Sequence, residues 1–202
     1  MKKELYLIRH GMSTANQLGI IQGHDDFPLA GEGIRQSRLL QQYFIREGIR
    51  FDLAFASDLK RASETASIAL AGLDICCCSE LREMGLGVWE GRKISEVNAD
   101  SEQWERWLNR PTQIEIEGSE NMECAQQRVF SFIDGICRNR SFTRAAFFTH
   151  GGVICLFLAG ITGSHLDLTW KFGHQNSAFS VVEFDSSYSL LGFNLQPHLE
   201  SA

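Results

Sequence analysis

The apolar residues of this chain form short continuous runs, which are separated by longer stretches of mixed character. The first run, Leu5 to Ile8, stops abruptly at Arg9. A run of this kind, bounded by polar residues, is typical of a strand buried on both faces of a sheet. The same pattern predicts further strands at residues 53–56, 75–79, 145–149, 179–184 and 190–193.

Between these runs, apolar residues recur at the three- and four-residue intervals of an amphipathic helix. The boundaries carry suitable residues, because Gly48 suits a helix C-terminus and Ser57 and Ser119 suit N-caps. We expect helices at residues 33–47 and 58–70, after Ser119, and at residues 153–159, which are apolar all round. A more polar stretch at residues 96–109 ends at Pro111.

The alternation of strands and helices favours an α/β fold, a three-layer α/β/α sandwich with a mainly parallel sheet. The 202 residues include only 3 prolines and no linker rich in Pro, Gly or Ser, so we expect one domain over residues 1–202. In such sheets a ligand binds beyond the carboxyl ends of the strands. The segments that follow the strands should therefore meet at one edge; they are residues 9–11, 57–61, 81–83 and 149–152.

The charge balance narrows the classes of function. With 19 Lys and Arg against 25 Asp and Glu, the formal net charge is −6. A mildly acidic chain is a poor general binder of nucleic acid or anionic membrane, so neither is expected as a partner. The apolar run near the N-terminus is too short for a signal peptide or a membrane span, which predicts a cytoplasmic protein.

The six cysteines form no Cys-x-x-Cys pair. Three of them are consecutive, Cys76 to Cys78. Neighbouring strand residues point to opposite faces, so these three are not expected to ligate one metal ion together. We expect reduced thiols that are mostly buried.

The groups expected at the sheet edge share a chemistry. A phosphate monoester needs positive donors around its oxygens, and the permanently charged guanidinium groups of Arg9 and Arg61 suit that role. His150 can donate a further hydrogen bond. Neutral His10 can attack phosphorus, since the arginines favour its unprotonated form. Glu83 can give a proton to the leaving oxygen. Each residue alone has an ordinary structural explanation, and it is their conjunction that predicts a phosphate-transfer site.

Six motifs follow one another along the chain: Leu7-Ile8-Arg9-His10-Gly11-Met12-Ser13-Thr14-Ala15-Asn16, Gln22-Gly23 with Asp26-Phe27-Pro28-Leu29 and Gly33, Ser57-Asp58-Leu59-Lys60-Arg61-Ala62 with Thr65-Ala66, Leu81-Arg82-Glu83 with Gly87-Val88-Trp89-Glu90-Gly91, Gly118-Ser119-Glu120 with Arg128, and Thr149-His150-Gly151-Gly152. Their types and order resemble those of the histidine phosphatase superfamily, also called phosphoglycerate-mutase-like proteins. The resemblance covers nearly the whole chain and implies that family's fold.

The resemblance also implies roles for the matched residues. His10 is implied as the phospho-accepting nucleophile, and Glu83 as the proton donor of the branch that retains this carboxylate. The implied phosphate-binding residues are Arg9, Asn16, Gln22, Gly23, Arg61, His150 and Gly151. No metal or other cofactor is implied, which agrees with the lack of a metal-ligand cluster in the sequence. A homodimer is allowed for but not required.

Three positions depart from the family pattern. Met12 stands where the family usually has Glu or Gln. Ala30 stands where Ser or Thr usually caps the next helix, so that cap should be weaker or shifted. The segment Gly118-Ser119-Glu120-Asn121 is a looser form of the usual Gly-Glu-Ser pattern. None of the three removes an implied catalytic group.

Several activities occur in this family. The resemblance to small broad-specificity or α-ribazole-type phosphatases favours hydrolysis of a small-molecule phosphate monoester through a phosphohistidine on His10. A phosphoglycerate mutase is the second candidate, although mutases carry an added segment and here Glu83 and His150 are only 67 positions apart. A protein phosphohistidine phosphatase is the third, and Glu83 argues against it because small proteins of that kind lack this carboxylate. The intact set of site residues argues against an inactive binding module.

In the family, residues corresponding to about 92–120 form a lid or specificity region. Trp104 and Trp107 lie in it, and we expect them to pack the lid onto the domain rather than to contact substrate. Candidate substrates are sugar phosphates, phosphoglycerates, phosphoserine, nucleotides and α-ribazole phosphate, among which the sequence does not choose.

Overall fold

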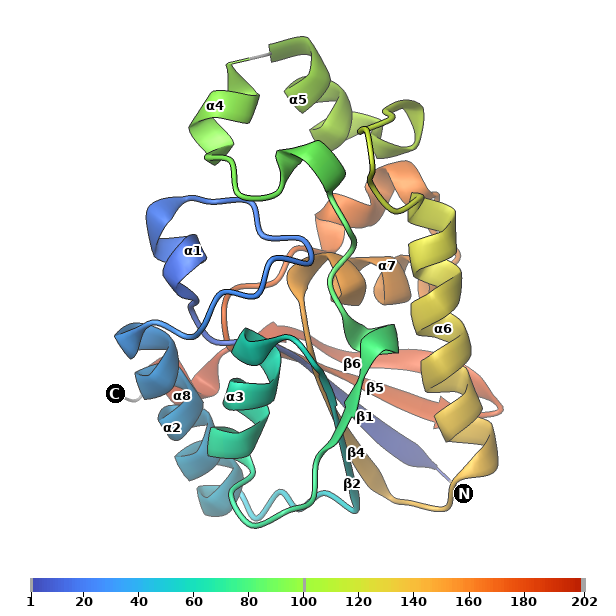
Figure 1. Ribbon diagram of the computed structural model, residues 1–202. Helices are drawn as coiled ribbons and strands as arrows, with labels where there is room; N and C mark the ends of the chain where they lie inside the picture. The colour runs from blue at the N-terminus through green and yellow to red at the C-terminus, as the bar shows by residue number, and fades with distance from the viewer. Residues whose placement is uncertain (1, 100, 201–202) are drawn as a thin grey trace.

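The computed structural model describes residues 2–99 and 101–200. Its centre is a six-stranded sheet with the strand order β3-β2-β4-β1-β5-β6 (Figure 1). The first four strands along the chain are mutually parallel, whereas β5 is antiparallel to β1 and β6 is antiparallel to β5. The strands are β1 (Lys3–Arg9), β2 (Leu53–Ser57), β3 (Cys76–Cys78), β4 (Arg144–Thr149), β5 (Phe179–Asp185) and β6 (Ser187–Leu195). The expected α/β fold is confirmed.

Helices cover both faces of the sheet (Figure 1). One face carries α2 (Gly31–Arg46), α3 (Lys60–Ala69) and the short α8 (Pro197–Glu200), and the other carries α6 (Met122–Asn139) and α7 (Gly151–Thr162). Successive strand residues point to opposite faces, so β1 contributes to both interfaces. Leu5 and Leu7 join the core under α6 and α7, while Tyr6 and Ile8 join the core under α2 and α3.

Helix α7 follows β4 with a single intervening residue, His150. Its residues from Val153 to Ala159 are buried, as their uniformly apolar character predicts. Because the helix packs against β1, α6 and η4 (Leu166–Phe172), it is fixed on several sides. The N-terminus of α7 is therefore held at the carboxyl edge of the sheet.

The remaining elements connect the layers, and Figure 1 shows α1, α4 and α5 beyond the carboxyl ends of the strands. They are α1 (Thr14–Leu18), η1 (Ser79–Leu81), η2 (Gly87–Trp89), α4 (Ile94–Asn98), α5 (Ser101–Asn109) and η3 (Pro111–Gln113). The polar stretch ends before Pro111 as expected, but it comprises two helices. In the described part of the chain no single helix is long and apolar enough to cross a bilayer, although α7 and η4 meet that test as a pair bent by 119°.

Two of the predicted helix caps are wrong. Helix α3 begins at Lys60 with Leu59 as its N-cap, because the hydroxyl of Ser57 faces inward and interacts with His150. Helix α6 is capped by Asn121, whose side-chain oxygen accepts a hydrogen bond from the backbone N–H of Cys124 at 3.1 Å. The missing side-chain cap at Ala30, at the start of α2, is confirmed.

The expectation that the thiols are mostly buried is also wrong. Cys78, Cys137 and Cys155 are buried, but Cys76, Cys77 and Cys124 are exposed, and all six are free. Two of the three exposed thiols, Cys76 and Cys77, lie on β3, a strand of only three residues at the edge of the sheet, and the third, Cys124, lies in the first turn of α6.

Candidate active site

The ends of β1 and β4 bring two histidine rings together. His10 follows β1 and His150 follows β4, and the two strands are neighbours in parallel register, with Arg9 opposite Thr149. The ring centroids lie 5.2 Å apart at an interplanar angle of 60°. Both rings are buried. The expected convergence of these strand ends is therefore present in the structure.

The protonation of His10 follows from its surroundings. Its Nδ1 lies 2.7 Å from the carbonyl oxygen of Gly11. A carbonyl can only accept, so Nδ1 carries the proton and Nε2 keeps a free lone pair. Burial, and then the guanidinium groups of Arg9 and Arg61, hold the pKa of His10 well below its ordinary value. The ring is a neutral base with its unshared electron pair on Nε2.

Arg61 is held in a fixed orientation by three acceptors. Its two terminal nitrogens donate to the carbonyl oxygens of Asp25 and Gly23, each at 2.8 Å, and Nε donates to Nδ1 of His150 at 3.2 Å. Gly23 has a φ of +49°, and a Cβ there would lie 2.0 Å from the Glu90 carboxylate. Glycine at this position thus lets the loop turn its carbonyl toward the buried guanidinium.

Arg9 supplies a donor that the protein does not use. Its Nη1 donates to the carbonyl oxygen of His174, whereas its Nε is buried and has no hydrogen-bond partner among residues 2–99 and 101–200. A Cβ on Gly151, the first residue of α7, would lie 3.4 Å from that Nε. The unpaired N–H therefore lies next to the N-terminus of α7, where unsatisfied backbone N–H groups favour an anion.

His150 uses both of its ring nitrogens. Nδ1 accepts from Arg61, so in the neutral ring the proton is on Nε2, which donates to the Ser57 hydroxyl at 2.8 Å. Burial and the charge of Arg61 keep the pKa of His150 well below its ordinary value. Donation from His150 to a phosphate, which the sequence predicts, requires one of these two contacts to be exchanged.

Glu83 also contacts the N-terminus of α7. Its Oε2 accepts from the backbone N–H of Gly152 at 3.1 Å, and its Oε1 accepts from that of Met84 at 3.0 Å. A Cβ on Gly152 would approach Glu83 Oε1 to 2.5 Å. The carboxylate interacts electrostatically with both Arg9 and Arg61, whose pKa values it raises against the lowering effect of burial. Glu83 is thus part of the same cluster.

Asn16 and Gln22 lie at the edge of this cluster. The Ser13 hydroxyl lies 3.0 Å from Oδ1 of Asn16 and 2.8 Å from Oε1 of Gln22. Asn176 donates to the same Asn16 oxygen at 3.1 Å. The protein's own contacts therefore use the amide oxygens, which leaves the NH₂ groups as donors for an anion.

The arrangement joins a neutral imidazole, two guanidinium groups, a helix N-terminus and a carboxyl group. The sequence profile of the histidine phosphatase superfamily (branch 1) matches residues 5–194. The chain belongs to this superfamily. The resemblance seen in the sequence is confirmed.

Several relatives are similar along nearly their full length. The adenosylcobalamin/α-ribazole phosphatase of Escherichia coli (strain K12) is 30% identical over 190 residues, covering 93% of each chain. Phosphoserine phosphatase 1 of Hydrogenobacter thermophilus is 29% identical over 200 residues, covering 97% of this chain and 94% of that protein. The probable phosphoglycerate mutase GpmB of Yersinia pestis (strain Pestoides F) is 29% identical over 187 residues, covering 91% and 86%.

The fold of this chain is also similar to that of a solved structure. The crystal structure of the α-ribazole phosphatase from Shigella flexneri aligns with a TM-score of 0.84 at 28% identity, over 96% of each chain. The similarity in sequence and in structure thus extends over the sheet, both helical layers and the segments between them.

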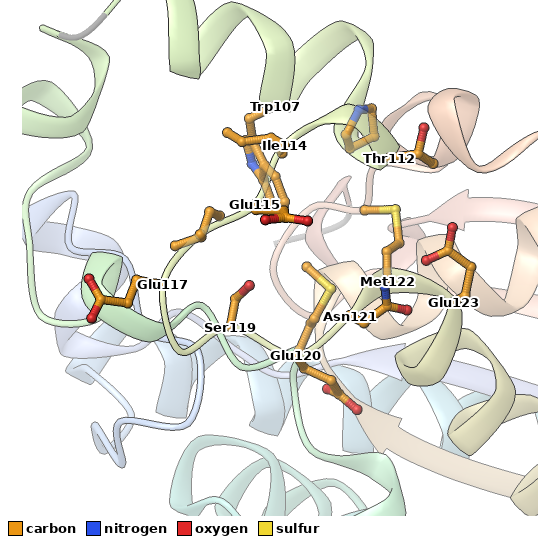
Figure 2. Close-up of a pocket in the computed structure, with 13 residues that line it drawn as sticks. Trp107, Thr112, Ile114, Glu115, Glu117, Ser119, Glu120, Asn121, Met122 and Glu123 are labelled. Carbon is orange, nitrogen blue, oxygen red and sulfur yellow. The ribbon is translucent and has the colours of Figure 1, made fainter.

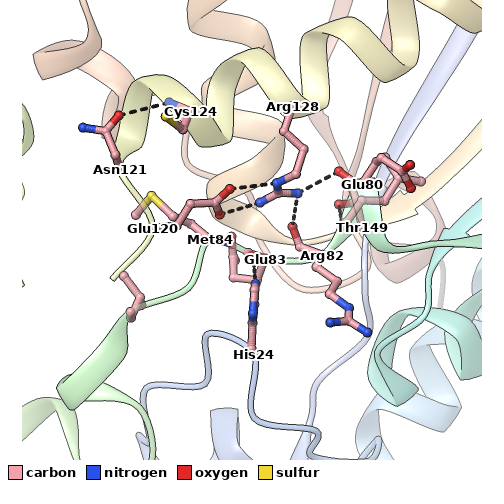
Figure 3. A network of polar contacts seen from close by, with 12 residues as sticks. His24, Glu80, Arg82, Glu83, Met84, Glu120, Asn121, Cys124, Arg128 and Thr149 are labelled. Carbon is pink, nitrogen blue, oxygen red and sulfur yellow. Dashed lines mark hydrogen bonds and ion pairs between the residues drawn. The ribbon is translucent and has the colours of Figure 1, made fainter. Parts of the chain in front are cut away.

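A second set of contacts holds the segment that carries Glu83 (Figure 3). Arg128 forms a two-bond ion pair with Glu120, at 2.8 and 2.6 Å, and also donates to the carbonyl oxygens of Glu80 and Arg82, at 2.7 and 3.1 Å. His24 Nε2 donates to the carbonyl oxygen of Glu83 at 2.8 Å. Neither Arg128 nor His24 is predicted from the sequence to be a site residue, although Arg128 lies in a matched motif and His24 directly follows Gln22-Gly23.

A cavity of about 480 Å³ lies beside this segment, lined by Met84, Trp107 and residues between Pro111 and Glu123 (Figure 2). Four carboxylates contribute to its wall: Glu115, Glu117, Glu120 and Glu123. The residues that line it do not include His10 or His150. Trp104 and Trp107 both contact the buried Trp89, with ring centroids 6.1 and 5.7 Å away, and so pack α5 onto the domain.

Within residues 2–99 and 101–200, no three or more His, Cys, Asp or Glu side chains are grouped so that they could hold a metal ion.

Proposed function

We propose that this protein hydrolyses a small-molecule phosphate monoester through a phosphohistidine formed on Nε2 of His10. One observation carries the proposal: the buried, neutral His10 ring donates from Nδ1 to Gly11 and keeps its Nε2 lone pair free beside Arg9 and Arg61. A nucleophile of this kind needs no base to activate it. The phosphatase relatives support the same class of reaction.

We assign the binding of the phosphoryl group to donors of the same cluster as His10. Arg9 contributes its unpaired Nε, Arg61 the N–H groups that its carbonyl partners leave free, and α7 the N–H of Gly151. Asn16 and Gln22 add their amide NH₂ groups. These donors balance the charge on the oxygens of the transferring group, so no metal ion is needed for that purpose.

In the first step Nε2 of His10 forms a bond to phosphorus as the bond to the leaving oxygen breaks. Glu83, when protonated, gives its proton to that oxygen. Each carboxyl oxygen of Glu83 accepts one backbone hydrogen bond, which leaves a second lone pair on each for the proton. In the second step the carboxylate takes a proton from water, the hydroxide attacks phosphorus, and the bond to His10 breaks.

The test is transfer of label from a ³²P-labelled monoester, followed by an alkaline quench that preserves phosphohistidine. With a labelled monoester whose phenolate leaving group needs no proton, the Glu83→Gln variant should accumulate label, because the first step is then little affected whereas the activation of water in the second step is slowed. The His10→Ala variant should carry none. His165→Ala, at an exposed position, is the matched control and should label like the parent protein. Label that persists in His10→Ala overturns the assignment of the nucleophile.

We further propose that turnover is independent of metal ions. The enzyme should keep its activity after dialysis against EDTA, and added Mg²⁺ or Zn²⁺ should not increase it. Loss of activity in the chelator, with recovery on addition of one metal, contradicts this proposal. Six free cysteines agree with a reducing, cytoplasmic location, which we propose on that ground.

We also propose that residues 1–202 are one domain and that residues of about 92–120 are its lid. The two cores share β1, and Trp104 and Trp107 pack onto Trp89. Exchanging this region for that of a relative should change the preferred substrate and leave the labelling of His10 intact.

The similarity to GpmB makes a phosphoglycerate mutase the second candidate. The two activities differ in the acceptor, because a mutase returns the phosphoryl group to the sugar acid and a phosphatase gives it to water. Incubation with 3-phosphoglycerate distinguishes them. Release of inorganic phosphate without 2-phosphoglycerate supports the phosphatase, and the reverse supports the mutase.

A further inference from the structure

The side-chain amide of Asn176 lies between three oxygen atoms around the nucleophile. Asn176 belongs to the segment that precedes β5, and it is outside the six motifs found in the sequence. Its Nδ2 donates to the carbonyl oxygens of His10 and Gly11, at 3.2 and 3.4 Å, and to Oδ1 of Asn16, at 3.1 Å. Backbone carbonyls can only accept, so the orientation of the Asn176 amide is fixed by its partners.

The acceptors of Asn176 are parts of the site proposed for the phosphoryl group. The carbonyl oxygen of Gly11 accepts from Nδ1 of His10 and thereby keeps the lone pair on Nε2. Asn16 also accepts from the backbone N–H of Ser13 at 3.1 Å, so both contacts use its oxygen and leave its NH₂ group for an anion. One side chain therefore links the carbonyl group that orients the nucleophile to an amide assigned to phosphate binding.

The backbone beside Asn176 is fixed against the end of β1. Ser177 is buried and has a φ of +59°, in the left-handed region that residues other than glycine rarely adopt. Its N–H donates to the carbonyl oxygen of His10 at 3.0 Å, and the carbonyl oxygen of His174 accepts from Arg9. A strained conformation persists where the surrounding contacts determine it, and such residues cluster at functional sites. Residues 174–177 thus have little freedom to move relative to His10.

We propose that Asn176 is a positioning residue for phosphoryl transfer to His10. Its amide holds the turn after β1 and the side chain of Asn16 in one arrangement, in which Nε2 of His10 and the NH₂ group of Asn16 act on the same phosphoryl group. Asn176 acts through its three acceptors and not on the phosphoryl group itself. This inference rests on the phosphohistidine proposed above.

The test is the steady-state kinetics of Asn176→Asp with p-nitrophenyl phosphate, with inorganic phosphate as competitive inhibitor. The carboxylate keeps the shape of the side chain, but it cannot donate to the three acceptors. We expect kcat/KM to fall by about tenfold to a hundredfold, since a displacement of about 1 Å near a reacting group has an effect of this size. The inhibition constant of phosphate should rise by about tenfold, as for loss of a hydrogen bond to an anion.

The inhibition constant separates positioning from a loss of folded protein. A smaller folded fraction lowers kcat and leaves the inhibition constant of phosphate unchanged, and that result would assign Asn176 a purely structural role. Asn176→Ala removes the amide without adding a charge and should shift both quantities in the same direction as Asn176→Asp. Gln175→Ala, at the adjacent exposed position, is the matched control and should keep the kinetics of the parent protein.

A double substitution tests the link to Asn16. Because Asn176 acts partly through Asn16, the variant with both Asn16→Ala and Asn176→Ala should lose less kcat/KM than the product of the two single losses. Losses that multiply exactly contradict this link. A parent protein that is labelled on His10, with unchanged kinetics in both Asn176 variants, overturns the present inference alone. A parent protein that carries no label on His10 overturns the proposed function instead.

Discussion

Arg61 donates from Nε to Nδ1 of His150 across 3.2 Å, and this contact decides which nitrogen of His150 carries a proton. The ring must then donate from Nε2 to Ser57. The orientation of a buried imidazole at the end of β4 thus depends on a guanidinium from α3 and a hydroxyl from β2. Two other segments of the chain therefore fix this side chain before any ligand binds.

Replacing Arg61 by lysine should show what this arrangement contributes. A single ammonium cannot reach Gly23, Asp25 and His150 with the geometry of a guanidinium. We expect kcat/KM to fall by about a hundredfold to a thousandfold, as for loss of a preorganised donor. Steady-state kinetics with p-nitrophenyl phosphate measures the effect. Arg35→Lys, on the exposed face of α2, is the control, and a similar rate in both variants would contradict the proposed role.

Gly152→Ala should separate activity from stability. The added methyl would lie 2.5 Å from Oε1 of Glu83, so the carboxylate must move. Within a helix, alanine is otherwise more stable than glycine by about 0.5–1 kcal/mol, so the melting temperature should not fall greatly. We expect a loss of turnover that is larger for an alkyl phosphate than for p-nitrophenyl phosphate, whose leaving group needs no proton. Gly135→Ala, at an open position in α6, should retain full activity on both substrates.

Arg128→Gln tests whether the ion pair with Glu120 positions the proton donor. Loss of the guanidinium frees the carbonyl groups of Glu80 and Arg82 and loosens the turn before Glu83. Turnover of an alkyl phosphate should fall by about tenfold to a hundredfold, less than the full effect of a general acid. Turnover of p-nitrophenyl phosphate should change little, which a simple loss of folded protein would not produce.

The control for this experiment is Arg138→Gln. Arg138 lies on the same helix and forms an exposed ion pair with Asp134, one turn away. Exposed pairs of this kind contribute at most about 1 kcal/mol. The control should therefore leave both rates unchanged, and an equal loss on both substrates in Arg128→Gln would assign that residue a purely structural role.

The pH dependence of stability should reflect four buried histidines. The pKa values of His10 and His150 are well below the ordinary value, and burial lowers those of His174 and His198 to about 4. In the unfolded chain a histidine titrates at about 6.5. Below about pH 6.5 the unfolded state binds protons that the native state does not, so the free energy of unfolding falls as the pH is lowered toward 4.

Above about pH 6.5 both states are neutral at these positions, and the histidine contribution should be constant. For His198 the full effect is about 3 kcal/mol at most. Urea unfolding between pH 4.5 and 8 measures it. His198→Leu should flatten the dependence, whereas His165→Gln, at an exposed position, should not. Parallel curves for the parent protein and His198→Leu would contradict the prediction.

The cluster of residues at the carboxyl ends of the strands could be predicted, because its position depends on local patterns. Buried strands have apolar runs that end at polar residues, and parallel strands end at the same edge, so His10, Arg61, Glu83 and His150 were expected together. What the local pattern does not contain is strand order. It therefore could not show that β3 is an edge strand with exposed thiols.

Contacts between distant segments were missed for a related reason. A serine before a helix ordinarily caps it, but Ser57 accepts a hydrogen bond from His150, 93 residues away. Arg128 and His24 hold the segment of Glu83 through its backbone carbonyls, which every residue possesses and which no sequence pattern marks. The five-residue helix α1 is too short to show helical periodicity.

The alternation of β1 between two cores constrains how the length of this chain can change during evolution. One residue inserted between Leu5 and Ile8 would exchange the faces of the apolar residues and displace His10 by about 3.3 Å along the strand. An insertion or deletion there removes the fold and the chemistry together. At the opposite end of the sheet lie the turn at Ser186 and the connection at residues 70–75. A change of length there shifts neither the apolar residues of β1 nor His10. Length variation among descendants of this sequence is expected to accumulate there.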